Sequence, residues 1–112
     1  MKIYYKNKSI NVSIKKPSPF NRLIGLMFKS KTNENLLFEF NKDTKMSIHS
    51  YFVSFDFLAV WLDKNNRVIE WKIVKPFSFI VRPRKPYLKL IEVPLNSKNK
   101  RIIDFFVGKG KI

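Results

Sequence analysis

The chain has 112 residues, of which 45% are hydrophobic and 15% aromatic, and its formal net charge is +15 at pH 7. This length predicts one domain, residues 1–112, with one hydrophobic core, and the apolar content excludes a disordered chain. The lack of cysteine excludes disulfides and thiol chemistry, and no apolar run is long enough for a signal peptide or a membrane-spanning helix, so a soluble, cytoplasmic protein is expected.

The N-terminal part of the sequence predicts a hairpin and then a short helix. The segments Lys2–Lys6 and Ile10–Lys15 alternate in polarity and are separated by the turn residues Asn7–Ser9. Ser18 is suited to cap a helix that has Pro19 at its first position. The apolar residues that then recur at helical spacing are Phe20, Leu23, Ile24 and Met27.

The rest of the chain predicts strands separated by turns. Asn41–Lys45 and Asp63–Asn66 are the turns, and Asn96–Arg101 is a basic one. The predicted strands are Leu36–Phe40, Ser47–Val53, Phe55–Leu62, Arg67–Lys75, Tyr87–Val93 and Ile102–Val107. No helical segment separates these strands, so the fold class is mainly β: an antiparallel, jelly-roll-like sandwich or a small barrel, with one short helix in the N-terminal half.

Several motifs occur in a characteristic order along the chain. The segment Arg22–Phe28 reads R-L-I-G-L-M-F, and Ile48–Asp56 reads I-H-S-Y-F-V-S-F-D. Later come the turn Asp63–Val68, the element Lys75–Phe77, and Ile91–Pro94, which reads I-E-V-P. Together they resemble the domain of unknown function 192 family, also called uncharacterised protein family 0127, over about residues 10–108. The resemblance implies a mainly β sandwich of jelly-roll type and no established activity, cofactor or partner.

Two carboxylates stand on apolar strand faces and are the candidate catalytic groups. Asp56 shares its predicted face with Leu58, and Glu92 shares its face with Leu90. Carboxylates in such places can have a raised pKa and mark functional sites, although they more often accept structural hydrogen bonds or pair with arginine. His49, the single histidine, could join them in acid–base chemistry. One histidine without cysteine does not make a zinc site, so we predict no metal and no cofactor.

A basic and aromatic segment is the candidate nucleic-acid interface. Arg82, Arg84 and Lys85 could contact phosphates while Tyr87 stacks on an unpaired base. The alternative, which aromatic residues of a small β domain favour, is that Phe77 and Phe79 fill the core and leave the charges in solvent. The basic residues expected to extend this surface are Lys98, Lys100 and Arg101.

The sequence favours a non-catalytic binding module with a basic surface for an acidic partner such as RNA. The alternative function is a small-ligand pocket or an enzyme centred on Asp56, Glu92 and His49. A scaffold that binds another protein through apolar surface is a third hypothesis. The sequence leaves the oligomeric state open.

Overall fold

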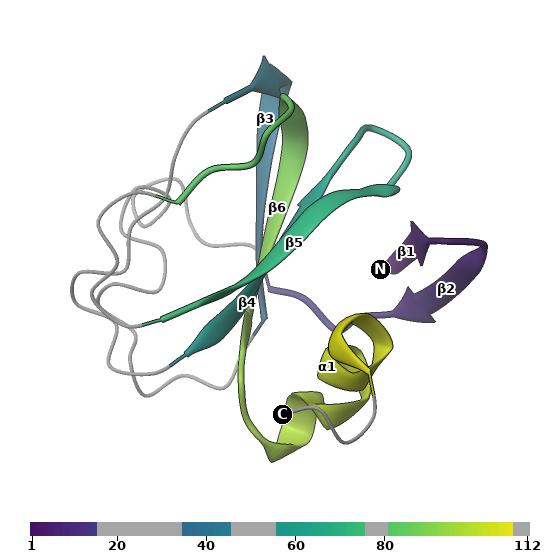
Figure 1. The fold of residues 1–112 in the computed structure, drawn as a ribbon. Coiled ribbons are helices and arrows are strands. Elements are labelled where there is room, and N and C mark those ends of the chain that lie inside the picture. The colour runs from purple at the N-terminus through teal and green to yellow at the C-terminus, as the bar shows by residue number, and fades with distance from the viewer. Residues whose placement is uncertain (16–34, 46–55, 76–80, 109–112) are drawn as a thin grey trace.

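The computed structural model describes residues 1–15, 35–45, 56–75 and 81–108 (Figure 1). Within these ranges the chain forms six strands, a 3₁₀ turn and one α-helix. The strands are β1 (Lys2–Tyr5), β2 (Lys8–Asn11), β3 (Leu36–Thr44), β4 (Phe57–Leu62), β5 (Val68–Val74) and β6 (Tyr87–Pro94). The 3₁₀ turn is η2 (Ser97–Asn99), and the helix is α1 (Lys100–Val107).

The strands form two antiparallel sheets. β1 and β2 make a separate two-stranded sheet, while the larger sheet has the order β3-β6-β4-β5. β4 lies at the centre, pairing with β5 on one side and β6 on the other, and all six of its residues are buried. The mainly β, antiparallel prediction is therefore confirmed. The barrel alternative is wrong for the described residues, in which β3 and β5 are opposite edges of an open sheet.

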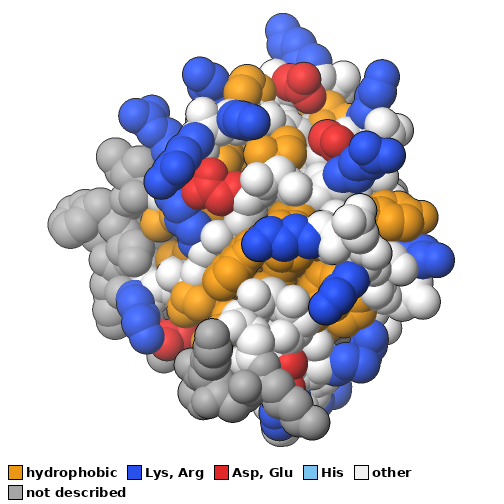
Figure 2. All heavy atoms as spheres, turned by 45° about the vertical axis from the view of Figure 1, so that its right-hand side comes forward, with side chains coloured by type: hydrophobic (Ala, Val, Ile, Leu, Met, Phe, Trp, Pro, Cys, Tyr) orange, Lys and Arg blue, Asp and Glu red, His pale blue; other side chains and the backbone are white. Residues whose placement is uncertain are grey.

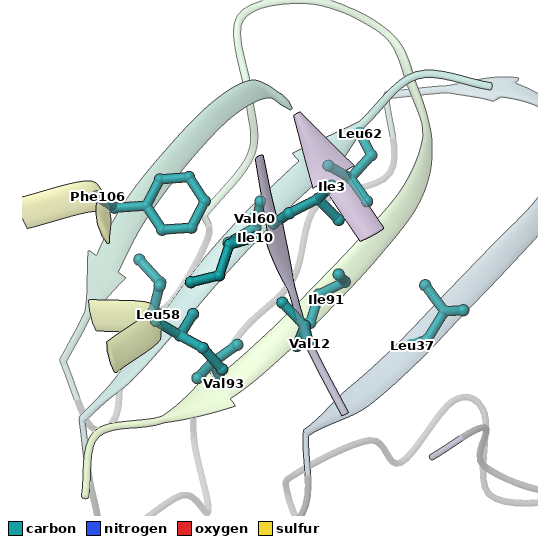
Figure 3. Close-up of a cluster of buried hydrophobic side chains, with 11 residues drawn as sticks. Ile3, Ile10, Val12, Leu37, Leu58, Val60, Leu62, Ile91, Val93 and Phe106 are labelled. Atoms are coloured by element: carbon teal, nitrogen blue, oxygen red, sulfur yellow. The ribbon is translucent and has the colours of Figure 1, made fainter. Parts of the chain in front are cut away.

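One face of the large sheet is covered by the hairpin β1–β2 and by α1, which lie on the same side of it (Figure 1). Strand alternation sends Ile3 and Ile10 of the hairpin inward. They meet the buried residues of the sheet in Figure 3, namely Leu37, Leu58, Val60, Leu62, Ile91 and Val93. Burial of each such side chain stabilises the fold by about 1.5–3 kcal/mol, so this contact fixes the position of the hairpin.

The opposite face of the sheet carries a second buried cluster, rich in aromatic rings. Trp61 of β4 and Tyr87 of β6 are both fully buried, and their ring centroids lie 6.3 Å apart in an edge-to-face arrangement. Phe40 packs edge-to-face on Tyr87 from β3, at 5.7 Å. These aromatic side chains therefore belong to the hydrophobic core.

The predicted last strand, Ile102–Val107, is wrong, because these residues belong to helix α1. Ile102, Ile103 and Phe106 are buried at helical spacing, and Lys100 pairs with Asp104 one turn later at 2.9 Å. Gly108 ends the helix with a φ of 103°, which glycine adopts without steric cost. The helix of the described chain is thus C-terminal, and the helix predicted to start at Ser18 lies outside the described residues.

Two turn predictions also differ from the structure. Asn41–Lys45 is not a turn, because β3 continues through it to Thr44. The first hairpin turns at Lys6 and Asn7, so β2 begins at Lys8, two residues before the predicted strand. The predicted strand Ser47–Val53 lies outside the described residues. No helix among the described residues is long and apolar enough to cross a bilayer.

Candidate anion-binding groove

The hairpin β1–β2 reverses through a two-residue turn that carries a lysine. Lys6 and Asn7 have φ values of 49° and 63°, and Tyr5 and Lys8 are the register pair that closes the turn. Positive φ at both central residues matches the twist of tight hairpins, and asparagine tolerates it well. The geometry places both Lys6 and Lys8 in solvent at the hairpin tip.

The β4–β5 turn lies where the sequence predicted it, at Asp63–Asn66, and it is organised by Asp63. One carboxylate oxygen of Asp63 accepts hydrogen bonds from the backbone N–H groups of Asn65 at 2.8 Å and Arg67 at 3.0 Å. Asn66 occupies the positive-φ position at 63°, where glycine or asparagine is favoured. The side chain of Asn66 accepts a hydrogen bond from the Lys89 ammonium at 2.6 Å. This turn is therefore rigidly built, and it exposes the side chain of Arg67.

The two turns are joined directly. The backbone N–H of Tyr4 donates to the carbonyl oxygen of Asn66 at 2.9 Å, and Tyr4 and Arg67 form a parallel β-bridge. A groove of about 720 Å³ opens between the two hairpins. Its lining residues are Tyr4, Tyr5, Lys6, Asn7, Lys8, Ser9, Asn65, Arg67 and Val68.

The groove is cationic. Three positively charged side chains line it, those of Lys6, Lys8 and Arg67, and none of its described lining residues is acidic. The Lys6 ammonium lies 5.3 Å from the centroid of the Tyr5 ring, a cation–π distance. The nearby Asp63 carboxylate already accepts backbone hydrogen bonds within its turn. The arrangement can hold a negatively charged group by charge and by hydrogen bonds from tyrosine, serine and asparagine.

The same face of the molecule is basic beyond the groove. Figure 2 turns the hairpin side of the molecule forward, and lysine and arginine side chains, with fewer acidic side chains between them, surround a band of hydrophobic side chains there. Arg101 of α1 lies beside the hairpin, because its guanidinium donates to the carbonyl oxygen of Asn11 at 2.8 Å. Positive charge on several elements is therefore gathered around the hairpin.

The predicted carboxylate cluster is only partly visible in the described residues. Asp56, next to β4, is partly exposed and forms an ion pair with Lys75 at 2.9 Å. Glu92 is buried in β6 opposite Ala59, and Asp56 precedes Ala59 by three residues, so strand alternation puts the two carboxylates on opposite faces. The described residues therefore do not bring Asp56 and Glu92 together. His49 lies outside them, and its role stays a prediction.

No group of three or more histidine, cysteine, aspartate or glutamate side chains that could hold a metal comes together within the described ranges. The two carboxylates of the predicted site show why. One belongs to a surface ion pair and the other to the interior of the sheet.

The predicted nucleic-acid residues divide into two groups. Arg82, Arg84 and Lys85 are exposed, and their segment is tied to β5. The backbone N–H of Arg84 donates to the Glu70 carboxylate at 2.9 Å, and the Lys72 ammonium donates to the Arg82 carbonyl oxygen at 3.0 Å. Their contact with phosphates stays a prediction.

Tyr87 is buried, whereas we predicted that its ring is exposed to a nucleic-acid base. Its side chain is fully buried among Phe40 and Trp61, so no face of the ring is open to a base. Burial, with a smaller contribution from the negative charge of Glu92, raises the pKa of Tyr87 to about 12. The tyrosine is a core residue, and the prediction that it stacks on nucleic acid is wrong.

The residues of the groove were not predicted from the sequence. The signal was present as Tyr-Tyr-Lys-Asn-Lys over residues 4–8, where two aromatic residues adjoin a basic turn. The prediction gave more weight to the basic segment between Pro83 and Pro86. The groove also depends on Arg67, which reaches it only through a contact between two distant turns.

The open antiparallel sheet with a packed hairpin defines a mainly β protein, and comparison with known families identifies its family. The chain belongs to the DUF192 family, whose model, described as "Uncharacterized ACR", matches residues 2–104. The prediction made from the R-L-I-G-L-M-F segment and the later motifs is confirmed. The match also takes in β1 and the groove-lining part of the hairpin, before the expected start near residue 10.

Two archaeal relatives share this family. The UPF0127 protein TK1120 of Thermococcus kodakarensis is 31% identical over 93 residues, which are 80% of this chain and 59% of the relative. The chain thus spans less than two thirds of that relative's length. The UPF0127 protein PF1050 of Pyrococcus furiosus is 29% identical over 92 residues, which are 80% of this chain and 78% of the relative.

Solved structures share the fold at low sequence identity. The crystal structure of protein R01717 from Sinorhizobium meliloti has a TM-score of 0.71 and 16% identity, covering 90% of this chain and 81% of that one. A protein of unknown function from Novosphingobium aromaticivorans has a TM-score of 0.62 and 15% identity, covering 84% of this chain and 69% of that one. These likenesses show the fold alone.

Proposed function

We propose that the protein is a binding module for a polyanionic partner, which it holds in the groove between the hairpin β1–β2 and the β4–β5 turn. One observation carries the proposal: Lys6, Lys8 and Arg67 converge from two turns on a concave site of about 720 Å³ with no carboxylate among its described lining residues. Such convergence concentrates the positive field where a ligand can enter.

The groove is a better candidate than the Arg82–Lys85 segment. The segment offers exposed charge, but Glu70 and Lys72 contact its backbone and its aromatic neighbour Tyr87 is buried. The groove combines cations with polar side chains in a concave site. The net charge of +15 adds long-range attraction for any polyanion.

A charge-matched pair of variants tests the proposal. In the groove variant Lys6, Lys8 and Arg67 become glutamine. In the control variant the exposed residues Lys42, Lys45 and Lys98, which lie outside the groove lining, become glutamine. Both changes lower the net charge by the same amount, so a difference between them reports the site and not the overall field.

The measurement is fluorescence anisotropy with labelled heparin and with long-chain inorganic polyphosphate, over about 50 to 200 mM salt. We expect the groove variant to lose roughly tenfold or more in affinity, and the control variant to lose clearly less. Equal losses in the two variants would show that only net charge matters. Absence of wild-type binding to both probes at the lowest salt would reject the binding module itself.

A further inference from the structure

The solvent-facing side of the hairpin β1–β2 combines polar side chains with an exposed aromatic ring. In the hairpin register, Lys2 is opposite Asn11 and Tyr4 is opposite Ser9. All four side chains are exposed, whereas Ile3 and Ile10 point into the core. The hairpin therefore presents a polar outer face that carries one exposed aromatic ring.

Tyr4 is the unusual member of this face. It is 44% exposed, and it is the large hydrophobic residue that the described part of the chain leaves in solvent. Packing does not require its ring, because the hairpin is held to the sheet by the residues on its other side. The Lys2 ammonium lies 6.0 Å from the ring centroid, at the outer limit of a cation–π contact. A planar ligand can therefore cover the ring at little cost.

An arginine lies on each side of this face. Arg101 is anchored beside β2 through its bond to the Asn11 carbonyl oxygen at 2.8 Å. Arg67 lies beside Tyr4, to which it is bridged, and both of these residues line the groove. The face thus has Arg101 and Lys2 near Asn11, and the Tyr4 ring with Arg67 at the edge of the groove. Lys2 and Tyr4 are two residues apart in an extended strand, so their Cα atoms are separated by roughly 7 Å.

We infer that the polyanion is a single-stranded nucleic acid, with a base stacked on Tyr4 and its flanking phosphates at Lys2, Arg101 and Arg67. This inference rests on the proposed function and names the ligand class of the same surface. Single strands offer unpaired bases to an exposed aromatic ring, while cations follow the backbone. A duplex keeps its bases stacked inside and gives Tyr4 nothing to cover, and a sulfated polysaccharide supplies charge without a base.

The test compares Tyr4→Ala with Tyr4→Phe on three probes: a labelled single-stranded oligothymidylate, a duplex of equal length, and labelled heparin. We expect Tyr4→Ala to lose roughly tenfold in affinity for the single strand, whereas Tyr4→Phe, which keeps the ring, stays near the wild type. Tyr4 also lines the groove, but heparin has no base to stack, so Tyr4→Ala should lose clearly less affinity for heparin than for the single strand. Circular dichroism that matches the wild type shows that this variant is folded.

A second variant tests the track of cations. Arg101→Gln should lower the slope of log affinity against log salt for the single strand by about 0.7, the value for one lost phosphate contact. If Tyr4→Ala leaves single-strand affinity unchanged, or if the wild type prefers duplex or heparin, the inference is wrong while the polyanion module stands. If the wild type binds none of the three probes, both fail together.

Discussion

The indole N–H of Trp71 donates a hydrogen bond to the hydroxyl oxygen of Tyr5 at 3.3 Å, joining β5 to the hairpin that forms the groove. The two residues are 66 positions apart in the chain. Phe106 of α1 packs against both rings, with centroid distances of 5.4 Å to Tyr5 and 5.9 Å to Trp71. The hairpin, the edge strand and the helix thus meet at one aromatic cluster beside the proposed binding surface.

Loss of the Tyr5 hydroxyl should weaken this junction slightly. We expect Tyr5→Phe to lower the free energy of unfolding by about 0.5–1.5 kcal/mol, because the Trp71 donor loses its partner while the ring packing remains. Urea denaturation followed by Trp fluorescence measures this change. Tyr4→Phe is the matched control and should stay within about 0.5 kcal/mol of the wild type, since the Tyr4 side chain is exposed. Equal stability of the two variants would contradict the assigned hydrogen bond.

Truncation of Phe106 should be far more damaging than truncation of its neighbour. Phe106 is 8% exposed and belongs to the core cluster, so Phe106→Ala should cost about 3–5 kcal/mol of stability. Phe105 is only half-buried, and Phe105→Ala in the same helix should cost less. Thermal denaturation of both variants compares them. If the two losses were equal, the C-terminal segment would not pack as the amphipathic helix described here.

The β4–β5 turn makes a prediction about Asn66. Alanine at this position meets a steric cost at a φ of 63° and cannot accept the hydrogen bond from Lys89. Asn66→Ala should therefore lose about 1–2 kcal/mol of stability. Asn66→Gly relieves the backbone cost and should lose clearly less, by chemical denaturation. A glycine variant as unstable as the alanine variant would show that the backbone conformation is not the cause.

The strands were predictable because their patterns are local. The continuous apolar run of β4 appears in the sequence and in the structure, and Trp71 and Ile73 of β5 pack on one cluster as predicted. Ile69 was predicted to share their face, but a register shift between Val68 and Glu70 puts it in the other cluster. The residue types at the β4–β5 turn were equally informative, since Asp63–Asn66 forms the turn that they predicted. Local residue chemistry therefore accounts for much of the large sheet.

Helix α1 was missed because a short apolar run is compatible with the periodicity of a helix and with that of a strand. Ile102–Val107 has the β-branched and aromatic residues of a strand, and only the spacing of Ile102, Ile103 and Phe106 indicates a helix. Packing of this face against the hairpin decides the outcome, and that contact is not visible in a single segment. The pair Lys100–Asp104 was the local signal that favoured a helix.

The candidate site was harder to predict than the fold. To predict a surface site, one must know which turns lie next to each other in the fold. The hydrogen bond from Tyr4 to Asn66 joins residues that are 62 positions apart in the chain. The exposure of an aromatic residue also depends on the final packing. Tyr87 follows a proline and a basic segment yet is buried, whereas Tyr4 lies in a similar basic context and is exposed.

Tyr87 provides a prediction at high pH. Its folded-state pKa, about 12, is above the ordinary value of 10.0 because burial disfavours the phenolate. Below pH 10 the hydroxyl is protonated in both states, so the full contribution to stability is present. Between about pH 10 and pH 12 the unfolded chain releases the proton first, and stability falls by up to about 1.4 kcal/mol per pH unit.

Two measurements separate this effect from the titration of the lysines. Absorbance of tyrosinate should show a late ionisation step in the folded protein, near pH 12, and Tyr87→Phe should remove that step. The stability of Tyr87→Phe should also fall less steeply between about pH 10 and pH 12 than that of the wild type, because the variant has no phenol there to ionise on unfolding. If Tyr87→Phe left the tyrosinate titration of the folded protein unchanged above pH 10, the ring of Tyr87 would be accessible to solvent and could still belong to the binding surface.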